Sequence, residues 1–341
     1  MKKLVAMLLT VVLLLSVGAA ALAQSKQIDK LVVAYVPSRD PQDIMNMTAP
    51  LSELLKEELK AQGVEVGTVE VTVTTNYEAA GEALSAGTAD VALIPGGTYV
   101  LYDDGADIIL TATRDGLSKD FPDAKDWNDG KETLGVAENQ VKYYRSLIIA
   151  GPSEKGQALA AKVNAGEELT WEDVDSATWA VMGASSSAGY IYPSLWLQEH
   201  FGKSVTDLSS AVTSDSYATS FARLAAGDCD VLVVYADGRR DYGEKWASEW
   251  GRTDSIWAPT ETNVIGVTEG IYNDGVAVSK NSKIMDETLI AALQQAFMNM
   301  NKTEVGKSVI SIYSHTGYAP ATSADYDGAR AAQEFLKSLQ K

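Results

Sequence analysis

Short apolar runs alternate with amphipathic segments along most of the chain, and this alternation restricts the folds that it can adopt. The clearest helical pattern spans residues 50–62, where the leucines share one face and Gly63 follows as a stop signal. Strand-like runs are predicted at residues 31–36, 69–75, 90–94, 108–113, 144–150, 179–182, 230–235, 264–267 and 275–278. Strands separated by helices predict an α/β fold with layered, largely parallel sheets.

The N-terminus has the pattern of a secretory signal peptide at residues 1–23. Lys2 and Lys3 precede an apolar run that is too short to span a bilayer, and small residues at 21 and 23 form a cleavage site before Gln24. No cysteine stands at that point, so the sequence predicts a periplasmic or extracellular protein without a lipid anchor. The remainder of the 341 residues is too long for one simple core and predicts two domains.

Charge and composition exclude several classes of function. The formal net charge is −18, which repels nucleic acid and anionic membrane surfaces, so neither is an expected partner. Cys229 is the only cysteine and lies in an apolar run, which predicts a small buried side chain. The common metal-binding and nucleotide-binding motifs do not occur, so no cofactor and no metal site is expected.

A serine-rich turn is the strongest candidate site. A predicted strand ends near residue 182, Ser185, Ser186 and Ser187 follow, and Gly189 is expected to begin an amphipathic helix. Unpaired N–H groups at a helix start, together with hydroxyl groups, suit an anion. No Lys or Arg lies between residues 179 and 202, so neutral donors would hold a small tetrahedral oxyanion. The alternative is an ordinary serine-rich loop with a helix cap.

An internal repeat indicates two similar lobes. Tyr77 and Tyr217 are each followed, at the same offsets, by a leucine, an Ala-Gly pair and an Asp-Val pair. Both segments predict a helix, a glycine stop and a buried strand. Two such lobes facing each other would form a cleft for a small molecule, with one tyrosine from each lobe. The alternative is an ordinary helix-to-strand connection that occurs twice by chance.

Five segments of the chain together resemble a known family more specifically than any single motif does. They are residues 88–102, 178–193, 220–242, 268–279 and 313–320. In content and order they resemble the phosphate-, phosphite- and phosphonate-binding proteins of ABC importers, the PhnD-type group of periplasmic-binding-protein-like receptors. The resemblance covers nearly all of the chain beyond the leader. It implies a type II fold with two α/β lobes, a two-strand hinge and a ligand cleft between the lobes.

The resemblance also implies function and organisation. Lobe 1 is expected at residues 28–113 plus 268–341, and lobe 2 at residues 114–267. The protein is expected to be a monomer that closes on a phosphonate, phosphite or phosphate and docks transiently on a membrane permease. It would bind its ligand without converting it.

Carried over position by position, the resemblance implies a set of ligand-binding residues. They are Tyr77, Ser185, Ser186, Ser187, Ala188, Tyr217, Asp237 and Asp274. Three positions depart from the family pattern: Ala188 lacks a hydroxyl, Ile94 replaces an aromatic residue and Tyr217 replaces a histidine. Carboxylates beside an anionic head group require a proton or an ammonium on the ligand, which favours an aminoalkylphosphonate or a protonated phosphate. Both aspartates also fit ordinary turns.

Two other functions stay open from the sequence. A receptor for a sulfonate or another small organic solute would use the same cleft. An exported serine hydrolase would use the turn at Ser185–Ser187, but the first glycine of the usual nucleophile elbow is missing. Only His200 and His315 are available as its base, and each also fits a structural role at a helix end.

Overall fold

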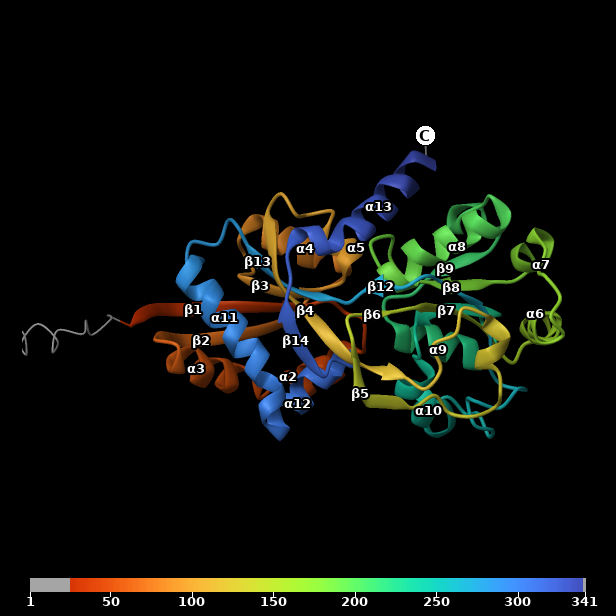
Figure 1. Cartoon of the computed structure of the whole chain (residues 1–341). Coiled ribbons are helices and arrows are strands. Elements are labelled where there is room, and N and C mark those ends of the chain that lie inside the picture. The colour runs from red at the N-terminus through yellow and green to blue at the C-terminus, as the bar shows by residue number, and fades with distance from the viewer. Residues whose placement is uncertain (1–24, 340–341) are drawn as a thin grey trace, which may run out of the picture.

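The computed structural model describes residues 25–339, and two β-sheets with surrounding helices lie side by side in it (Figure 1). The predicted signal peptide and its cleavage site lie outside these residues. Between residues 25 and 339, no helix is both long enough and apolar enough to cross a membrane.

The larger sheet contains the first strands of the chain and its last ones. Its order is β14-β4-β13-β3-β1-β2, with β5 paired to β4. The strands are β1 (Lys26–Tyr35), β2 (Val64–Val73), β3 (Val91–Ile94), β4 (Ala106–Leu117), β5 (Gly135–Val141), β13 (Gly275–Ser279) and β14 (Gly317–Pro320). The helices on this side are α2 (Pro41–Thr48), α3 (Leu51–Ala61), α4 (Tyr77–Ala86), α5 (Gly96–Tyr99), α11 (Glu287–Asn299), α12 (Glu304–Ile310) and α13 (Asp327–Leu339).

The smaller sheet is built from the middle of the chain, in the order β11-β7-β10-β8-β9. Its strands are β7 (Ser146–Ala150), β8 (Trp179–Val181), β9 (Ala211–Thr213), β10 (Val231–Tyr235) and β11 (Asn263–Val267). The helices here are α6 (Glu154–Asn164), α7 (Trp171–Asp175), α8 (Tyr192–Phe201), α9 (Tyr217–Ala226) and α10 (Arg239–Ser248).

Short elements complete the two halves. A two-stranded pair, β6 (Tyr143–Tyr144) with β12 (Ile271–Tyr272), lies between the sheets where the chain passes from one to the other (Figure 1). One π-helical turn, η2 (Ser187–Ile191), precedes α8. The 3₁₀ turns are η1 (Ala124–Trp127), η3 (Val205–Asp207), η4 (Met300–Lys302), η5 (Ser311–Tyr313) and η6 (Ser323–Tyr326).

All nine predicted strands are present, but the prediction of largely parallel sheets is wrong. β1 runs parallel to β2 and β3, whereas β13 runs antiparallel to both of its neighbours, β3 and β4. In the smaller sheet, β7 likewise runs antiparallel to β10 and β11. The chain leaves the larger sheet after β5 and returns to it after β11, so a strand that follows a crossing enters its sheet from the opposite end.

The internal repeat corresponds to equivalent units in the two halves. α4 and α9 each span 10 residues and begin at a side-chain cap, from Asn76 and Ser216 respectively. They end at Gly87 and Gly227, whose φ angles of 69° and 79° are in the left-handed region that glycine tolerates best. Each helix then leads into a fully buried strand, β3 or β10.

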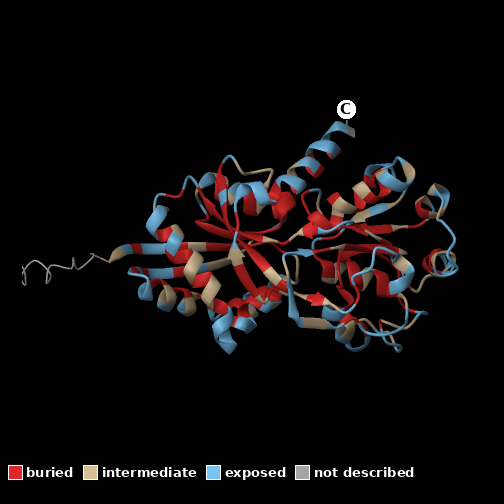
Figure 2. Cartoon of the chain, in the orientation of Figure 1, coloured by how far each residue is buried: buried red, intermediate tan, exposed pale blue. Residues whose placement is uncertain are grey.

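The core follows the central strands of both sheets (Figure 2). β3, β7 and β10 are buried at every position, which explains their continuous apolar sequences, since helices cover both faces. Cys229 lies beside this core with 1% of its surface exposed, as predicted. Burial raises the pKa of its thiol to about 12, so the group is protonated and unreactive near neutral pH.

One of the two predicted limits between the lobes coincides with the end of a strand, since β11 ends at Val267, and the other does not. The boundary between residues 113 and 114 falls inside β4, whose last residues, Arg114–Leu117, pair with β5. β5 is therefore joined by hydrogen bonds to the larger sheet, although the sequence places it in lobe 2. The division into residues 28–113 plus 268–341 and residues 114–267 stays a prediction.

Paired leucines in the two repeats offer a test of that division. Leu84 and Leu224 are both fully buried at equivalent positions of α4 and α9. Changing either to alanine should lower the free energy of unfolding by about 2–5 kcal/mol. With two lobes, Leu84→Ala should speed amide hydrogen exchange mainly in β1 and β3, and Leu224→Ala mainly in β8 and β10. Equal acceleration of both sheets by each variant would indicate one cooperative unit instead.

Candidate functional site

The serine turn lies at the contact between the two halves of the molecule. The backbone N–H of Gly97, from α5, donates to Oγ of Ser187 at 3.0 Å. The hydroxyl of Thr98, also from α5, lies 3.2 Å from both Oγ and the carbonyl oxygen of Ser185. A Cβ on Gly97 would lie 2.3 Å from Cδ1 of Ile191 and 2.9 Å from the Ser185 carbonyl oxygen. The chain can approach this closely only because residue 97 has no side chain.

The geometry of the turn leaves hydroxyl protons available. Ser186 is the N-cap of η2, so the helix begins before the predicted Gly189, and its Oγ accepts the N–H of Gly189 at 3.2 Å. The same Oγ lies 3.3 Å from the hydroxyl of Tyr217. Because Oγ of Ser186 and Oγ of Ser187 each accept a backbone N–H, both hydroxyls can donate their protons to a further acceptor.

A small cavity, called the inner cavity below, opens beside this turn. Its volume is about 30 Å³, room for only a few heavy atoms, since one water needs about 10–15 Å³ on this measure. It is lined by Val36, Ser38, Arg39, Tyr77, Pro95, Arg114, Tyr144, Ser186, Ser187, Ala188, Tyr217, Tyr235, Asp274 and Tyr313. The structure thus brings together six of the eight predicted residues, namely Tyr77, Ser186, Ser187, Ala188, Tyr217 and Asp274.

The other two predicted residues do not line the inner cavity. Ser185 is buried against Thr98. Asp237 faces a second, larger space, the outer cavity, and its carboxylate is already engaged. Nε and Nη2 of Arg239 lie 3.0 and 2.8 Å from its two oxygens, and the Thr133 hydroxyl donates to it at 2.8 Å. Its side chain therefore has little capacity left for a ligand.

Two arginines in the inner cavity are absent from the sequence prediction. Arg39 follows β1, and its guanidinium donates to Asp241 at 2.7 Å. Arg114 belongs to β4 and is 8% exposed, with its guanidinium carbon 4.6 Å from the ring centre of Tyr144. The sequence prediction considers Lys and Arg only between residues 179 and 202, so it misses both arginines, which belong to the larger half. Both follow predicted strands, at residues 31–36 and 108–113, and this position is the signal that could have identified them.

The tyrosines of the inner cavity are hydroxyl donors at neutral pH. Burial raises the pKa of Tyr77, Tyr144 and Tyr217 above the ordinary phenol value. Tyr77 and Tyr217 are the first residues of α4 and α9, so two helix N-termini also point their positive ends here. Tyr144, Tyr235 and Tyr313 are further cavity residues that the sequence prediction misses.

Asp274 is the acidic group of the inner cavity. Its carboxylate lies 3.5 Å from both Nη2 of Arg114 and the Tyr144 hydroxyl, and 3.9 Å from Nε2 of His315. Burial by itself would raise the pKa of Asp274, but His315 and Arg114 outweigh this effect and hold the pKa below its ordinary value. Asp274 is therefore ionised at neutral pH.

The histidines are not arranged as bases for the serine turn. Nδ1 of His200 lies 2.8 Å from the carbonyl oxygen of Trp196, and Nδ1 of His315 lies 3.2 Å from the Tyr318 hydroxyl. Across residues 25–339, neither ring makes a hydrogen bond to a serine. Over the same residues, no group of three or more His, Cys, Asp or Glu side chains is placed to hold a metal ion.

Comparison with known proteins gives a family match and several structural relatives. Residues 33–326 match the profile of a family described as "ABC transporter, phosphonate, periplasmic substrate-binding protein". PhnD1 from Prochlorococcus marinus, solved with methylphosphonate, is 16% identical with a TM-score of 0.61, over 91% of this chain and 98% of that one.

Two further structures have the same fold. The binding protein component of an ABC phosphonate transporter from Pseudomonas aeruginosa is 13% identical with a TM-score of 0.61, covering 91% of this chain and 87% of that one. A Xanthomonas citri protein bound to ATP is 13% identical with a TM-score of 0.62, covering 91% and 98%. The likeness confirms the predicted α/β fold of the two-lobe, periplasmic-binding-protein type.

The buried histidine beside the site predicts a pH dependence of stability. Burial lowers the pKa of His315 from 6.5 to about 4. The unfolded chain therefore takes up a proton here at a higher pH than the folded chain, and stability falls as the pH drops from about 6.5 to 4. The slope should be up to about 1.4 kcal/mol per pH unit. The free energy of unfolding would be measured in urea at pH 7, 6 and 5 for the wild-type protein and for His315→Gln. The variant should show a smaller loss of stability with falling pH, and an equal dependence on pH in both proteins would contradict the prediction.

Proposed function

The chain belongs to the family of periplasmic phosphonate substrate-binding proteins of ABC transporters, and we propose that it binds a small phosphonate-like oxyanion in the inner cavity. Members of this family deliver a ligand to a membrane permease and do not convert it. The proposed ligand is a phosphonate, phosphite or phosphate. Export through the signal peptide at residues 1–23 and a monomeric state are parts of the same proposal.

The observation that carries the proposal is the environment of Arg114. Its guanidinium is buried, its contact with Asp274 is loose at 3.5 Å, and Nε has no hydrogen-bond partner among the described residues. A buried donor left unpaired costs about 1–3 kcal/mol, and more when the group is charged. An oxyanion in the inner cavity would accept from Arg114, from the hydroxyls of Ser186 and Ser187, and from the tyrosines.

The contacts between the halves support binding by closure of two lobes. Tyr217 donates its backbone N–H to the carbonyl oxygen of Ser38 at 3.3 Å. Arg39 pairs with Asp241, and Asp43 pairs with Lys245 at 2.9 Å. These contacts join residues 38–43 of the larger half to α9 and α10 of the smaller one. A ligand between the two halves would stabilise the closed arrangement to the extent that it binds the closed arrangement more tightly than the open one.

Asp274 favours a head group that carries a proton. An ionised carboxylate beside a fully ionised oxyanion is repulsive, whereas a P–O–H group donates a hydrogen bond to it. A sulfonate has no such proton near neutral pH. The alternative is that Asp274 pairs with the ammonium of an aminoalkylphosphonate, without help from Asp237, whose oxygens bind Arg239 and Thr133.

The first test removes single donors from the inner cavity. Ser187→Ala should weaken methylphosphonate binding about tenfold to a hundredfold in calorimetric titration, because one oxyanion oxygen loses its partner. Arg114→Gln should weaken it at least as much, because a charge-assisted hydrogen bond is lost. Ser308→Ala, on the exposed face of α12, is the control and should leave the affinity unchanged. Unchanged affinity in both cavity variants would remove the inner cavity from the binding site.

The second test asks whether the head group donates a proton to the Asp274 carboxylate. Wild-type protein should bind methylphosphonate at least about tenfold more tightly than methanesulfonate, and Asp274→Asn should narrow this difference. Affinity for methylphosphonate should fall as the pH rises from 6 to 8.5 and the head group loses its proton. A marked preference for 2-aminoethylphosphonate, without this pH dependence, would assign Asp274 to an ammonium instead. Tighter binding of the sulfonate would contradict the proposed ligand class.

A further inference from the structure

The outer cavity adjoins the inner one and shares its walls. Arg114, Tyr144 and Tyr235 line both spaces. The outer cavity has a volume of about 250 Å³, close to the lower end of the range of about 300 Å³ and above for sites that hold small organic ligands. The inner cavity, at about 30 Å³, has room only for a head group. A ligand held by its head in the inner cavity can therefore extend past Arg114 into the outer one.

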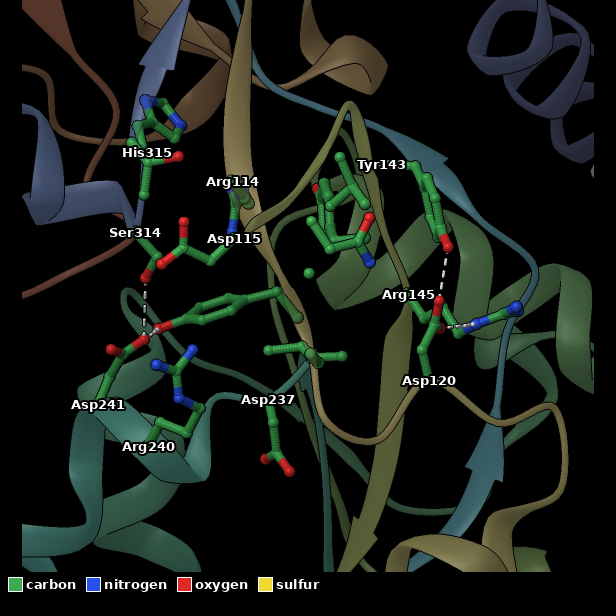
Figure 3. A pocket seen from close by; sticks show the side chains of 18 of the residues that line it. Arg114, Asp115, Asp120, Tyr143, Arg145, Asp237, Arg240, Asp241, Ser314 and His315 are labelled. Carbon is green, nitrogen blue, oxygen red and sulfur yellow. Dashed lines mark hydrogen bonds and ion pairs between the residues drawn. The ribbon is translucent and has the colours of Figure 1, made fainter. Parts of the chain in front are cut away.

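The outer cavity is lined mainly by charged and polar side chains of both signs (Figure 3). Arg114 and Asp115 come from β4, Arg240 and Asp241 from α10, and Ser314 and His315 from the segment before β14. Leu117, Val141 and Ala236 are the aliphatic residues among those that line it. An alkyl tail would cover these charged groups without replacing the water that solvates them, which is unfavourable.

Several of these groups have unused hydrogen-bonding capacity. Among the described residues, the guanidinium of Arg240 makes no hydrogen bond or ion pair, and Asp115 uses only Oδ1, which accepts from Gln140 at 2.5 Å. Asp241 uses only Oδ2, which binds Arg39, Tyr235 and Ser314. The cavity thus presents free donors and free acceptors together.

We propose that the ligand is an oxyanion ester or phosphonate with a short hydroxylated tail, and that the outer cavity binds this tail. The inference rests on the proposed function, because it places the head group in the inner cavity. A hydroxyl both donates and accepts, so neighbouring hydroxyls on one tail can donate to Asp115 and accept from Arg240. An alkyl chain can do neither.

The test uses two phosphates that differ only in two hydroxyl groups. Glycerol 3-phosphate and n-propyl phosphate have the same head group and the same number of carbon atoms. In calorimetric titration of the wild-type protein, glycerol 3-phosphate should bind at least about tenfold more tightly. Arg240→Gln and Asp115→Asn should each reduce this ratio toward one while changing the affinity for propyl phosphate less than about twofold. Asp104→Asn, exposed before β4, is the matched control and should preserve the ratio.

The outcomes separate this inference from the proposed function. Equal or tighter binding of propyl phosphate overturns the inference, and so does a ratio that neither cavity variant changes. If methylphosphonate binds but neither tailed phosphate does, the inference fails and the proposed function stands. If methylphosphonate, phosphite and phosphate all fail to bind, the proposed function fails and the inference fails with it.

Discussion

The burial of the Arg114 guanidinium between the two halves is the constraint on which the site depends. A charge removed from water needs close partners, and this one has a tyrosine ring at 4.6 Å and a carboxylate at 3.5 Å. β4 fixes its position, since that strand pairs with β13 and β14 at one end and with β5 at the other. The serine turn, the tyrosines and Asp274 are arranged around this cation, and together they form a polar chamber that suits an anion.

Arg114 and Asp274 lie where the chain passes between the two halves. β4 carries Arg114 toward the smaller half, and the return segment through β12 carries Asp274 back toward β13. The cation and the carboxylate of the inner cavity therefore lie on the two segments that connect the halves. A change in the angle between the halves would alter their separation, so the electrostatics of the chamber and the conformation of the molecule are coupled.

The fold was largely predictable from the sequence, and the site only in part. Apolar runs identified nine of the strands, because buried strands need continuous apolar residues, whereas β5 and β9 are largely exposed and lack such runs. Gly87 and Gly227 marked the helix ends. The direction of β13 and β7 was not predictable, because it depends on where the chain crosses between sheets. Tyr77, Tyr217 and the serine turn have local signals. Arg39 and Arg114 have only the weaker signal of a position just after a predicted strand, and it is tertiary structure that brings them to the turn. Asp237 has a turn sequence that gives no sign of its pairing with Arg239.

Gly97 has a consequence for the timing of ligand exchange. Its N–H, from one half, binds the oxygen of Ser187, from the other, so this serine reaches its full hydrogen-bonding arrangement only when the halves are in contact. The contact also leaves no space for a side chain at residue 97 and hence no gap for solvent at that point. The inner cavity is therefore closed on this side, and a small anion could pass Gly97 only after the halves separate. Its other route leads past Arg114 into the outer cavity, so the rate of release would depend both on separation of the halves and on how tightly the anion binds Arg114.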